Sequence, residues 1–239
     1  MTTAVRTIGA GVLAGLCVFA PQVLGQALDI APISQTLEVA QRTTSFTLVN
    51  RSDRPTEVQI RPYRWTQHDQ HDQLTATTDL QVSPPFAQIA PGQTQIVRML
   101  VGKSDRAQEQ TFRVVFDQLP DADTSKVQLT FRLIVPVFVK GAGSAPEPLA
   151  WRLQQSGDQI MLSASNAAGQ HVRLTDLRLS DSEGRVFKVL RDTLPYLLAD
   201  SEGQWRVADP THLLHSGVRL HLTSSGRLDA QDSWLTLGP

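Results

Sequence analysis

The sequence contains a single cysteine, Cys17, among its 239 residues. It lies inside an apolar run, Ile8 to Ala20, that we expect to be removed from the mature protein. Without it, the mature chain can have no disulfide, no thiol nucleophile and no thiolate metal site. A lipoprotein attachment at Cys17 is disfavoured because Leu16 precedes it where a small residue is expected. An exported protein without disulfides must derive its stability from its core.

Charge of either sign is sparse and balanced. Lysine and arginine number 22, aspartate and glutamate 23, and the formal net charge is −1. No broad basic field indicates a nucleic-acid partner. The motifs G-x-S-x-G, H-E-x-x-H and G-x-x-x-x-G-K are absent, and the carboxylates are scattered among turns. We therefore expect neither enzymatic activity, nor use of ATP, nor any cofactor.

Only one long hydrophobic run is present, and it is too short to span a membrane comfortably. The run from Ile8 to Ala20 follows the basic Arg6, and the small residues Gly25 and Ala27 come after it. A basic start, a short apolar core and small residues are typical of a secretory signal peptide. We expect residues 1–25 to be this signal, with cleavage after Gly25 or Ala27. A retained anchor is the alternative; after cleavage, no membrane insertion is expected.

Histidines gather at two places that carry metal-ligating residue types. The segment His68 to Asp72 reads HDQHD, but nothing apolar surrounds it, and a metal site needs neighbouring groups that orient its ligands. We expect a solvated hairpin loop there. His212 and His215, followed by His221, have a spacing that suits a helix, but the Ser-Gly pair after them would end any helix at once. No metal site is predicted at either place.

Short alternating stretches are what the sequence has in abundance, and no amphipathic helix of a dozen residues is evident. Seven or so short strands separated by Gly, Pro, Asn and Asp, over about a hundred residues, are typical of an immunoglobulin-like sandwich. The clearest of them are Leu28–Val39, Thr44–Asn50, Glu57–Trp65, Gln93–Val101 and Thr111–Leu119. They place a first domain at residues 26–140.

A second domain is indicated after the stretch GAGSAPEP at 141–148, whose small residues and prolines predict a linker. Strand-like segments then resume at Leu149–Leu153, Gln159–Ala164, His171–Leu179, Val186–Leu190, Gln204–Val207, Val218–Leu222 and Trp234–Leu237. They predict a smaller β-sandwich at residues 149–239. The chain is thus expected to be all-β, with two immunoglobulin-like sandwich domains.

The stretch 127–140, VQLTFRLIVPVFVK, alternates with a period of two residues and predicts a strand. A proline at 136 would not be tolerated in a central strand, so this is expected to be an edge strand. One face is apolar and carries Val127, Leu129, Phe131 and Leu133. Such an edge is an aggregation hazard. The face is either buried within its own sandwich or offered to another chain, and the residues alone leave both possibilities open.

Several segments, in their order and spacing, resemble periplasmic pilus chaperones, and the whole chain resembles a PapD-like chaperone of a chaperone–usher pathway. In the first domain they are Thr47–Asn50, Tyr63–Trp65, Ser83–Phe86, Ala90–Arg98, Phe112–Arg113, Gln118–Pro120 and Val135–Val139. In the second domain they are Asn166, His171–Leu177, Tyr196–Leu198 and Trp205. The runs Arg-Trp-Thr-Gln, Pro-Gly-Gln-Thr-Gln and Pro-Val-Phe are most similar to the archaic, Csu-type branch.

This resemblance implies two immunoglobulin-like domains set at an angle with a cleft between them. It also implies an ATP-independent periplasmic chaperone that folds and caps pilin subunits and delivers them to an outer-membrane usher. A pilin lacks its own last strand, and the chaperone lends one by donor-strand complementation. The donor residues implied are Val127, Leu129, Phe131, Leu133 and Val135.

The sequence departs from the best-known branch at the site that clamps the carboxylate of the subunit. Those chaperones use an arginine on the first strand and a lysine at the foot of the donor strand. Residues 26–41 contain neither type, and Pro136 fills the lysine position. Arg98, Arg113 and Arg132 remain as candidates, either for the carboxylate anchor or for an ion pair between the domains. The resemblance associates Arg98 with the interdomain network.

Two functions of other classes stay open. The first is a secreted two-domain adhesion or carbohydrate-binding module that uses loops or aromatic platforms, such as Tyr63 and Trp65. The second is a metal-dependent hydrolase that would require His68 or His212.

Overall fold

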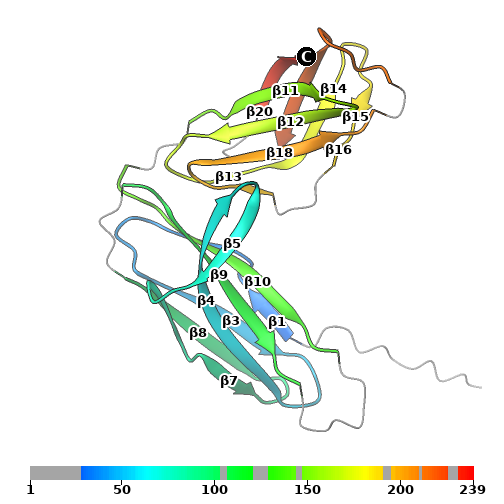
Figure 1. Cartoon of the computed structure of the whole chain (residues 1–239). Coiled ribbons are helices and arrows are strands. Elements are labelled where there is room, and N and C mark those ends of the chain that lie inside the picture. The colour runs from blue at the N-terminus through cyan, green and yellow to red at the C-terminus, as the bar shows by residue number, and fades with distance from the viewer. Residues whose placement is uncertain are drawn as a thin grey trace, which may run out of the picture.

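The computed structural model describes residues 28–102, 107–120, 129–143, 147–190, 195–209, 212–225 and 231–239. The predicted signal peptide and Val127 lie outside these ranges. Within them every regular element is a strand, and no helix there is long and apolar enough to cross a membrane. The strands form two groups, one in each half of the chain, stacked end to end (Figure 1).

The first group forms two sheets that face each other. One sheet has the order β1-β3-β8-β6, formed by Leu28–Ala31, Thr43–Asn50, Thr94–Val101 and Leu80–Ser83. The other has the order β2-β10-β9-β4-β5, formed by Gln35–Leu37, Arg132–Val139, Gln110–Gln118, Thr56–His68 and His71–Ala76. A further strand, β7 (Phe86–Ile89), pairs with β4. The β2–β10 pair is parallel and the other pairs are antiparallel.

Alternate side chains of these strands meet between the two sheets. Phe46 from β3 and Phe116 from β9 are fully buried, and their rings meet edge to face with centroids 5.6 Å apart. Val135 and Val137 bring β10 into the same core. Burial of each such side chain contributes roughly 1.5–3 kcal/mol. The period-two patterns of the sequence thus close into a sandwich.

The second group forms a separate core from shorter strands. Its main sheets have the orders β11-β12-β18-β16 and β15-β14-β19-β20, and β13 pairs with β17. The bounds are Ala150–Ser156 (β11), Gln159–Asn166 (β12), Val172–Arg173 (β13), Thr175–Ser180 (β14), Val186–Phe187 (β15), Val189–Leu190 (β16), Tyr196–Leu197 (β17), Ser201–Val207 (β18), Arg219–Ser225 (β19) and Gln231–Thr236 (β20). Leucines such as Leu162, Leu179 and Leu220 are fully buried there. The predicted all-β architecture of two sandwiches is confirmed.

The segment between the two sandwiches is attached to the first one at its start. β10 ends at Val139 and β11 begins at Ala150. The amide of Gly143 donates to the carbonyl of Ala107 at 2.9 Å. A Cβ at Gly141 would lie 2.2 Å from that same carbonyl oxygen, so no larger residue fits there. The linker bounds 141–148 stay a prediction, and residues 144–146 lie outside the described part.

The hydrogen-bond register of β10 decides which way its backbone groups point. The amide of Gln118 donates to the carbonyl of Phe131 at 3.0 Å, directly before the strand begins. In an antiparallel pair, every second residue exchanges both its bonds with the neighbouring strand. The odd-numbered residues of β10 therefore face β9, and the even-numbered ones face away. On that other side the amide of Lys140 donates to the carbonyl of Leu37 at 3.0 Å, which agrees with this assignment.

We expect proline at two neighbouring positions of β10 to have different effects on stability. Val135→Pro removes an N–H that faces Val114 of β9 and leaves a buried carbonyl unpaired, which costs about 1–3 kcal/mol. Ile134→Pro removes an N–H that faces away from β9. Urea unfolding should show the larger loss for Val135→Pro, after Val135→Ala has corrected for lost packing. Equal losses would contradict the register.

Candidate functional site

Half of β10 has a free edge. β2 pairs with Val137–Val139, and no other described strand lies beside Arg132–Val135 on that side. Arg132 and Ile134 direct an N–H and a C=O to this open side. Pro136 is buried, and the parallel register that sets Val137 opposite Gln35 directs its C=O to β2. The predicted edge strand is therefore found in the first half of β10, while β2 covers the second half.

The exposure of the alternating side chains falls steadily toward the core. Leu129 is 94% exposed, Phe131 and Leu133 are half-buried against the core of the first sandwich, and Val135 is 1% exposed. Val127 lies outside the described residues. The apolar face is thus continuous with the domain's own core at Val135 and open to solvent at Leu129. Its role toward a partner stays a prediction.

A charged group lies on the other face of the same strand. Arg132 donates to the carboxylate of Asp117 through Nε at 2.5 Å, and Arg61 donates to the second oxygen of that carboxylate. Burial alone would raise the pKa of Asp117, but the hydrogen bonds from Arg132 and Arg61 outweigh it and hold the pKa below its ordinary value. Two guanidinium groups share one carboxylate, so one positive charge remains in excess beside the open edge.

Arg113 lies deeper, toward the second domain. It is 2% exposed, and its guanidinium lies 3.5 Å from the ring centroid of Trp65. Its ion-pair partner is Asp72, with the closest atoms 3.4 Å apart. Burial lowers the pKa of Arg113, and the charge of Asp72 acts in the opposite direction.

Arg98 lies on a different sheet. It is exposed on β8, between Ser45 of β3 and Ser83 of β6. Its neighbours Val97 and Met99 are in the core, so its own side chain points outward. Within the described residues it forms no ion pair. The three candidate arginines are therefore not brought together in the structure.

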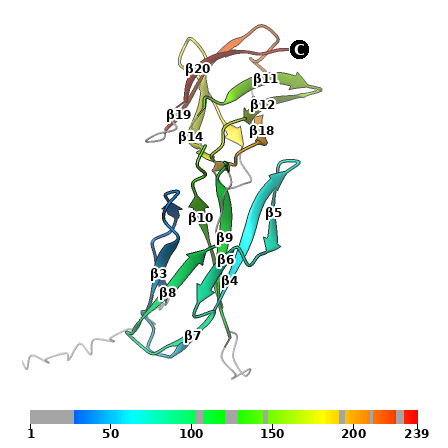
Figure 2. The same ribbon diagram turned by 90° about the vertical axis from the view of Figure 1, so that its left-hand side faces the viewer.

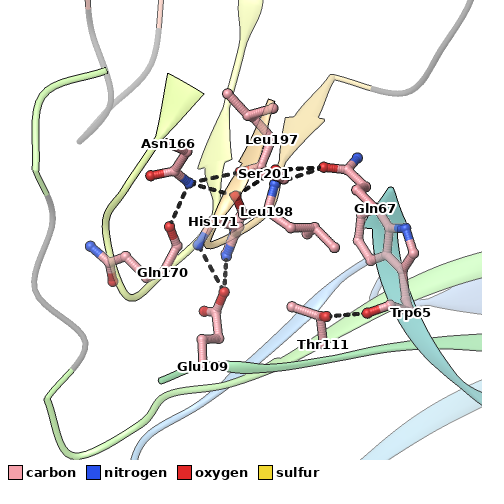
Figure 3. Close-up of polar contacts among 10 residues, drawn as sticks. All are labelled: Trp65, Gln67, Glu109, Thr111, Asn166, Gln170, His171, Leu197, Leu198 and Ser201. Carbon is pink, nitrogen blue, oxygen red and sulfur yellow. Dashed lines mark hydrogen bonds and ion pairs between the residues drawn. The ribbon is translucent and has the colours of Figure 1, made fainter. Parts of the chain in front are cut away.

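A polar contact between the domains joins Glu109, just before β9, to His171 of the second domain. The carboxylate of Glu109 accepts the amide N–H of His171 at 2.9 Å and lies 2.8 Å from its ring Nδ1 (Figure 3). The imidazole stacks on Phe138 of β10 with ring centroids 3.5 Å apart. An even-numbered side chain of β10 is thus part of the contact between the domains.

Gln67, near the end of β4, is the second polar bridge of the joint. Its side-chain amide donates to the carbonyl of Tyr196 at 3.0 Å. Its carbonyl accepts the amide of Leu198 at 2.9 Å and the hydroxyl of Ser201 at 3.1 Å (Figure 3). The hairpin of β4 and β5 rises from the first sandwich to make this contact (Figure 2). A cleft of about 380 Å³ lies beside it, lined by residues of both domains.

The histidine-rich segment is a tight hairpin, as expected. β4 ends at His68 and β5 begins at His71, and both connecting residues, Asp69 and Gln70, have positive φ. Gln70 contacts Gln204 of the second domain at 3.0 Å. Across the described part of the chain, no three His, Cys, Asp or Glu residues are grouped so that they could hold a metal ion.

Trp65 does not form an exposed aromatic platform. It is fully buried at the joint, where its ring packs against Phe138 and Tyr196. The expectation that Tyr63 and Trp65 could bind a sugar at the surface is therefore wrong for Trp65. Side chains far apart in the sequence cover this tryptophan, so its local pattern could not reveal the burial.

Residues 28–144 match the family model described as pili and flagellar-assembly chaperone, PapD N-terminal domain. The chain belongs to the PapD-like pilus chaperones. No curated protein sequence matches this chaperone, but solved structures do. One is the CsuC–CsuE chaperone–tip adhesion subunit complex of the archaic Csu pili of Acinetobacter baumannii, at 21% identity and a TM-score of 0.67, covering 90% of this chain and 100% of that chain.

Two further structures have the same fold. The chaperone YadV has 18% identity and a TM-score of 0.64, and the alignment covers 89% of this chain and 100% of that one. The Pseudomonas aeruginosa chaperone CupB2 has 14% identity and a TM-score of 0.60, with 88% and 100% covered. The two-domain architecture of this chaperone is thus that of solved pilus chaperones.

Sequence reasoning missed two features of the edge. Ile134 is 40% exposed there but falls on the face opposite Leu133, so a search for one alternating row passes over it. Asp117 was missed because its arginine partners lie on two other strands. The sequence did contain a signal for it, because Asp117 is a charged residue within the mostly apolar run FRVVFDQ.

Asp117→Asn should change how the chaperone responds to acid. The pKa of Asp117 is depressed on folding, so its ion pairs stabilise the fold above the unfolded pKa of about 3.9 and lose this effect as the pH falls below it. Because Arg61 and Arg132 are partly exposed to solvent, these ion pairs contribute only about 1 kcal/mol to the free energy of unfolding. The difference in melting temperature between wild type and variant should shrink from about pH 6 to about pH 3. A pH-independent difference would contradict the assignment.

Gln67→Ala should loosen the joint between the domains. It leaves the amide of Leu198 and the carbonyl of Tyr196 without this partner. Small-angle scattering should give a larger radius of gyration than for wild type. Gln73→Ala, at an exposed position of β5, is the matched control and should scatter as wild type does. Identical curves for all three proteins would show that Gln67 does not fix the domains.

Proposed function

We propose that this chaperone captures pilin subunits by lending them the open edge of β10. The observation that carries the proposal is the exposure of Leu129, a large apolar side chain that is 94% exposed. It lies three residues before β10, and the outer backbone groups of Arg132 and Ile134 have no strand partner among the described residues. A folding subunit that lacks one strand offers the complementary surface, since it exposes both an apolar groove and an unpaired edge. The role needs neither ATP nor a catalytic group.

The physical contributions to capture are of two kinds. Burial of Val127, Leu129, Phe131 and Leu133 in the subunit contributes roughly 1.5–3 kcal/mol for each fully buried side chain, and less for those already half covered. Backbone hydrogen bonds at the edge set the register, because a slip by one residue would turn the polar face inward. Val135 is already packed in the core of the chaperone's first sandwich. In the complex it would lie where this core meets the core of the subunit.

The partner class follows from the family. CsuC was solved with the tip adhesion subunit CsuE, and the Salmonella enterica chaperone SafB with the pilin SafA. We extend this to the present chaperone: its client is a pilin-like subunit, it acts in the periplasm after removal of its signal peptide, and it delivers the subunit to an outer-membrane usher. The likeness to CsuC supports placing it in the archaic, Csu-type branch.

Of the candidate carboxylate anchors, Arg132 suits the role best. Its side chain is 61% exposed beside the open edge, whereas that of Arg113 is 3% exposed, lies over the ring of Trp65 and is paired with Asp72. Arg98 lies on the other sheet of the sandwich. A carboxylate that approaches β10 from its open side therefore meets Arg132 first and can compete for it with Asp117.

A sugar-binding module is the less favoured function. The platform it required includes Trp65, which is fully buried. An exposed apolar strand edge, by contrast, is a surface for a polypeptide and not for a sugar.

Leu129→Asp should abolish subunit capture without unfolding the chaperone. The side chain makes little contact with the fold, so a charge there disturbs only a partner that buries it. The test is co-expression with the pilin-like subunit encoded nearest to the chaperone gene, followed by pull-down from the periplasm. The yield of complex should fall at least about tenfold, with an unchanged melting temperature.

The control is Val186→Asp, which charges an apolar side chain that is 64% exposed in the second domain. It should leave capture intact. Phe131 is less suitable as a test position because it packs against the chaperone's own core. Undiminished co-purification of Leu129→Asp would refute strand donation.

A further inference from the structure

Arg132 and Ile134 present side chains as well as backbone groups at the open edge. Leu133 and Val135 pack against the core of the first sandwich, so the side chains of Arg132 and Ile134 point to the opposite, outer face of the sheet. There the side chain of Arg132 is 61% exposed, and Ile134 is 40% exposed. The two residues that offer an N–H and a C=O to a partner strand are therefore also the two that meet it on the outer face.

Arg132 carries hydrogen-bond donors that the fold leaves unused. It lies directly opposite Asp117 of β9, and its Nε donates to that carboxylate at 2.5 Å. Arg61 donates to the other oxygen of the same carboxylate, so one of the two positive charges stays uncompensated. A guanidinium has five N–H donors, and among the described residues only the Nε of Arg132 has a partner. A carboxylate on a strand beside β10 would continue a row of alternating charge from Asp117 through Arg132.

Ile134 stands at the end of an apolar row on the same face. It lies opposite Val115 of β9, which is 4% exposed, and no described strand lies on its other side. Side chains on one face of neighbouring strands pack as pairs. An apolar side chain on a client strand would cover the exposed part of Ile134 and extend the row by one strand. A charged side chain there would lose hydration without gaining a partner.

We propose that the outer face of β10 selects the sequence of the client strand. The strand that pairs with β10 carries an acidic side chain beside Arg132 and an apolar side chain beside Ile134. Because same-face residues of a strand are two positions apart, these two client residues are also two apart, whichever way the strand runs. This inference rests on the proposed strand donation and deepens it. The apolar row on the core face supplies bulk, and the outer-face pair discriminates between client strands.

Competition between two chaperones for one subunit measures this preference. Wild type and one variant, with different tags, are co-expressed with a limiting amount of the pilin-like subunit encoded nearest to the chaperone gene. Arg132→Gln and Ile134→Ser should each capture about two- to fivefold less subunit than wild type, the range for one cross-strand pair. Arg132→Lys keeps the charge and Ile134→Val keeps the apolar character, so both should lose less. Melting temperatures verify that each variant is folded.

The controls make the same changes away from the edge. Leu100→Ser alters a side chain that is also 40% exposed, on the other sheet of the first sandwich. Arg178→Gln removes an exposed arginine of the second sandwich. Both control variants should capture as much subunit as wild type.

Substitutions in the subunit identify the two partner positions. Each Asp or Glu of its strands is changed to the corresponding amide, and each apolar residue of its edge strands to Ser. One acidic position should abolish the difference between wild type and Arg132→Gln, and one apolar position that between wild type and Ile134→Ser. These two positions should lie two residues apart. A subunit extended by two glycines, which moves its terminal carboxylate, should still discriminate against Arg132→Gln.

The outcomes separate this inference from strand donation. Three results would overturn the outer-face selection and leave strand donation standing: wild-type capture by either edge variant, partner positions that are absent or at another spacing, and loss of discrimination on the glycine extension. Undiminished capture by Leu129→Asp would overturn strand donation, and the outer-face selection with it.

Discussion

Backbone N–H and C=O groups at the edge of a sheet require a partner, and in this chaperone that requirement falls on Arg132 and Ile134. β2 satisfies the same side of β10 only from Val137 onward. The apolar core of the sandwich extends toward the same edge through Phe131 and Leu133 and ends at the exposed Leu129. A surface with polar groups along its backbone and apolar side chains along one face matches a fold that lacks one strand.

The face of β10 opposite Phe131 and Leu133 contacts the second domain near the end of the strand. Phe138 stacks on His171, whose amide and ring contact Glu109, while Gln67 bridges from the β4–β5 hairpin to Tyr196, Leu198 and Ser201. One strand therefore carries the open edge at its beginning and the domain contact at its end. The position of the second domain relative to the open edge is set by polar bridges and ring contacts on strands that also build the first sandwich.

Local pattern was enough to predict the strand and its edge character. The alternation of residues 127–133 predicts an extended backbone, and the proline at 136 predicts that the strand lies at an edge. Both depend on residues close together in the sequence. The structure confirms a strand from Arg132 to Val139. What covers each face was not predictable in the same way. Phe131 packs on a core built by distant strands, and Trp65 is buried because Phe138 and Tyr196 close over it. The pairing of Asp117 with Arg61 and Arg132 likewise requires three strands to be aligned. These features arise from long-range contacts that one sequence does not encode locally.

Amide hydrogen exchange along β10, compared between the free chaperone and its complex with a pilin-like subunit, tests the central claim most directly. In the free protein the amides of Arg132 and Ile134 should exchange fast, while those of Leu133 and Val135, which face β9, should be protected. On binding, Arg132 and Ile134 should become protected as well. Protection of Arg132 and Ile134 already in the free chaperone, or none gained in the complex, would contradict the account of β10 as an open edge completed by its client.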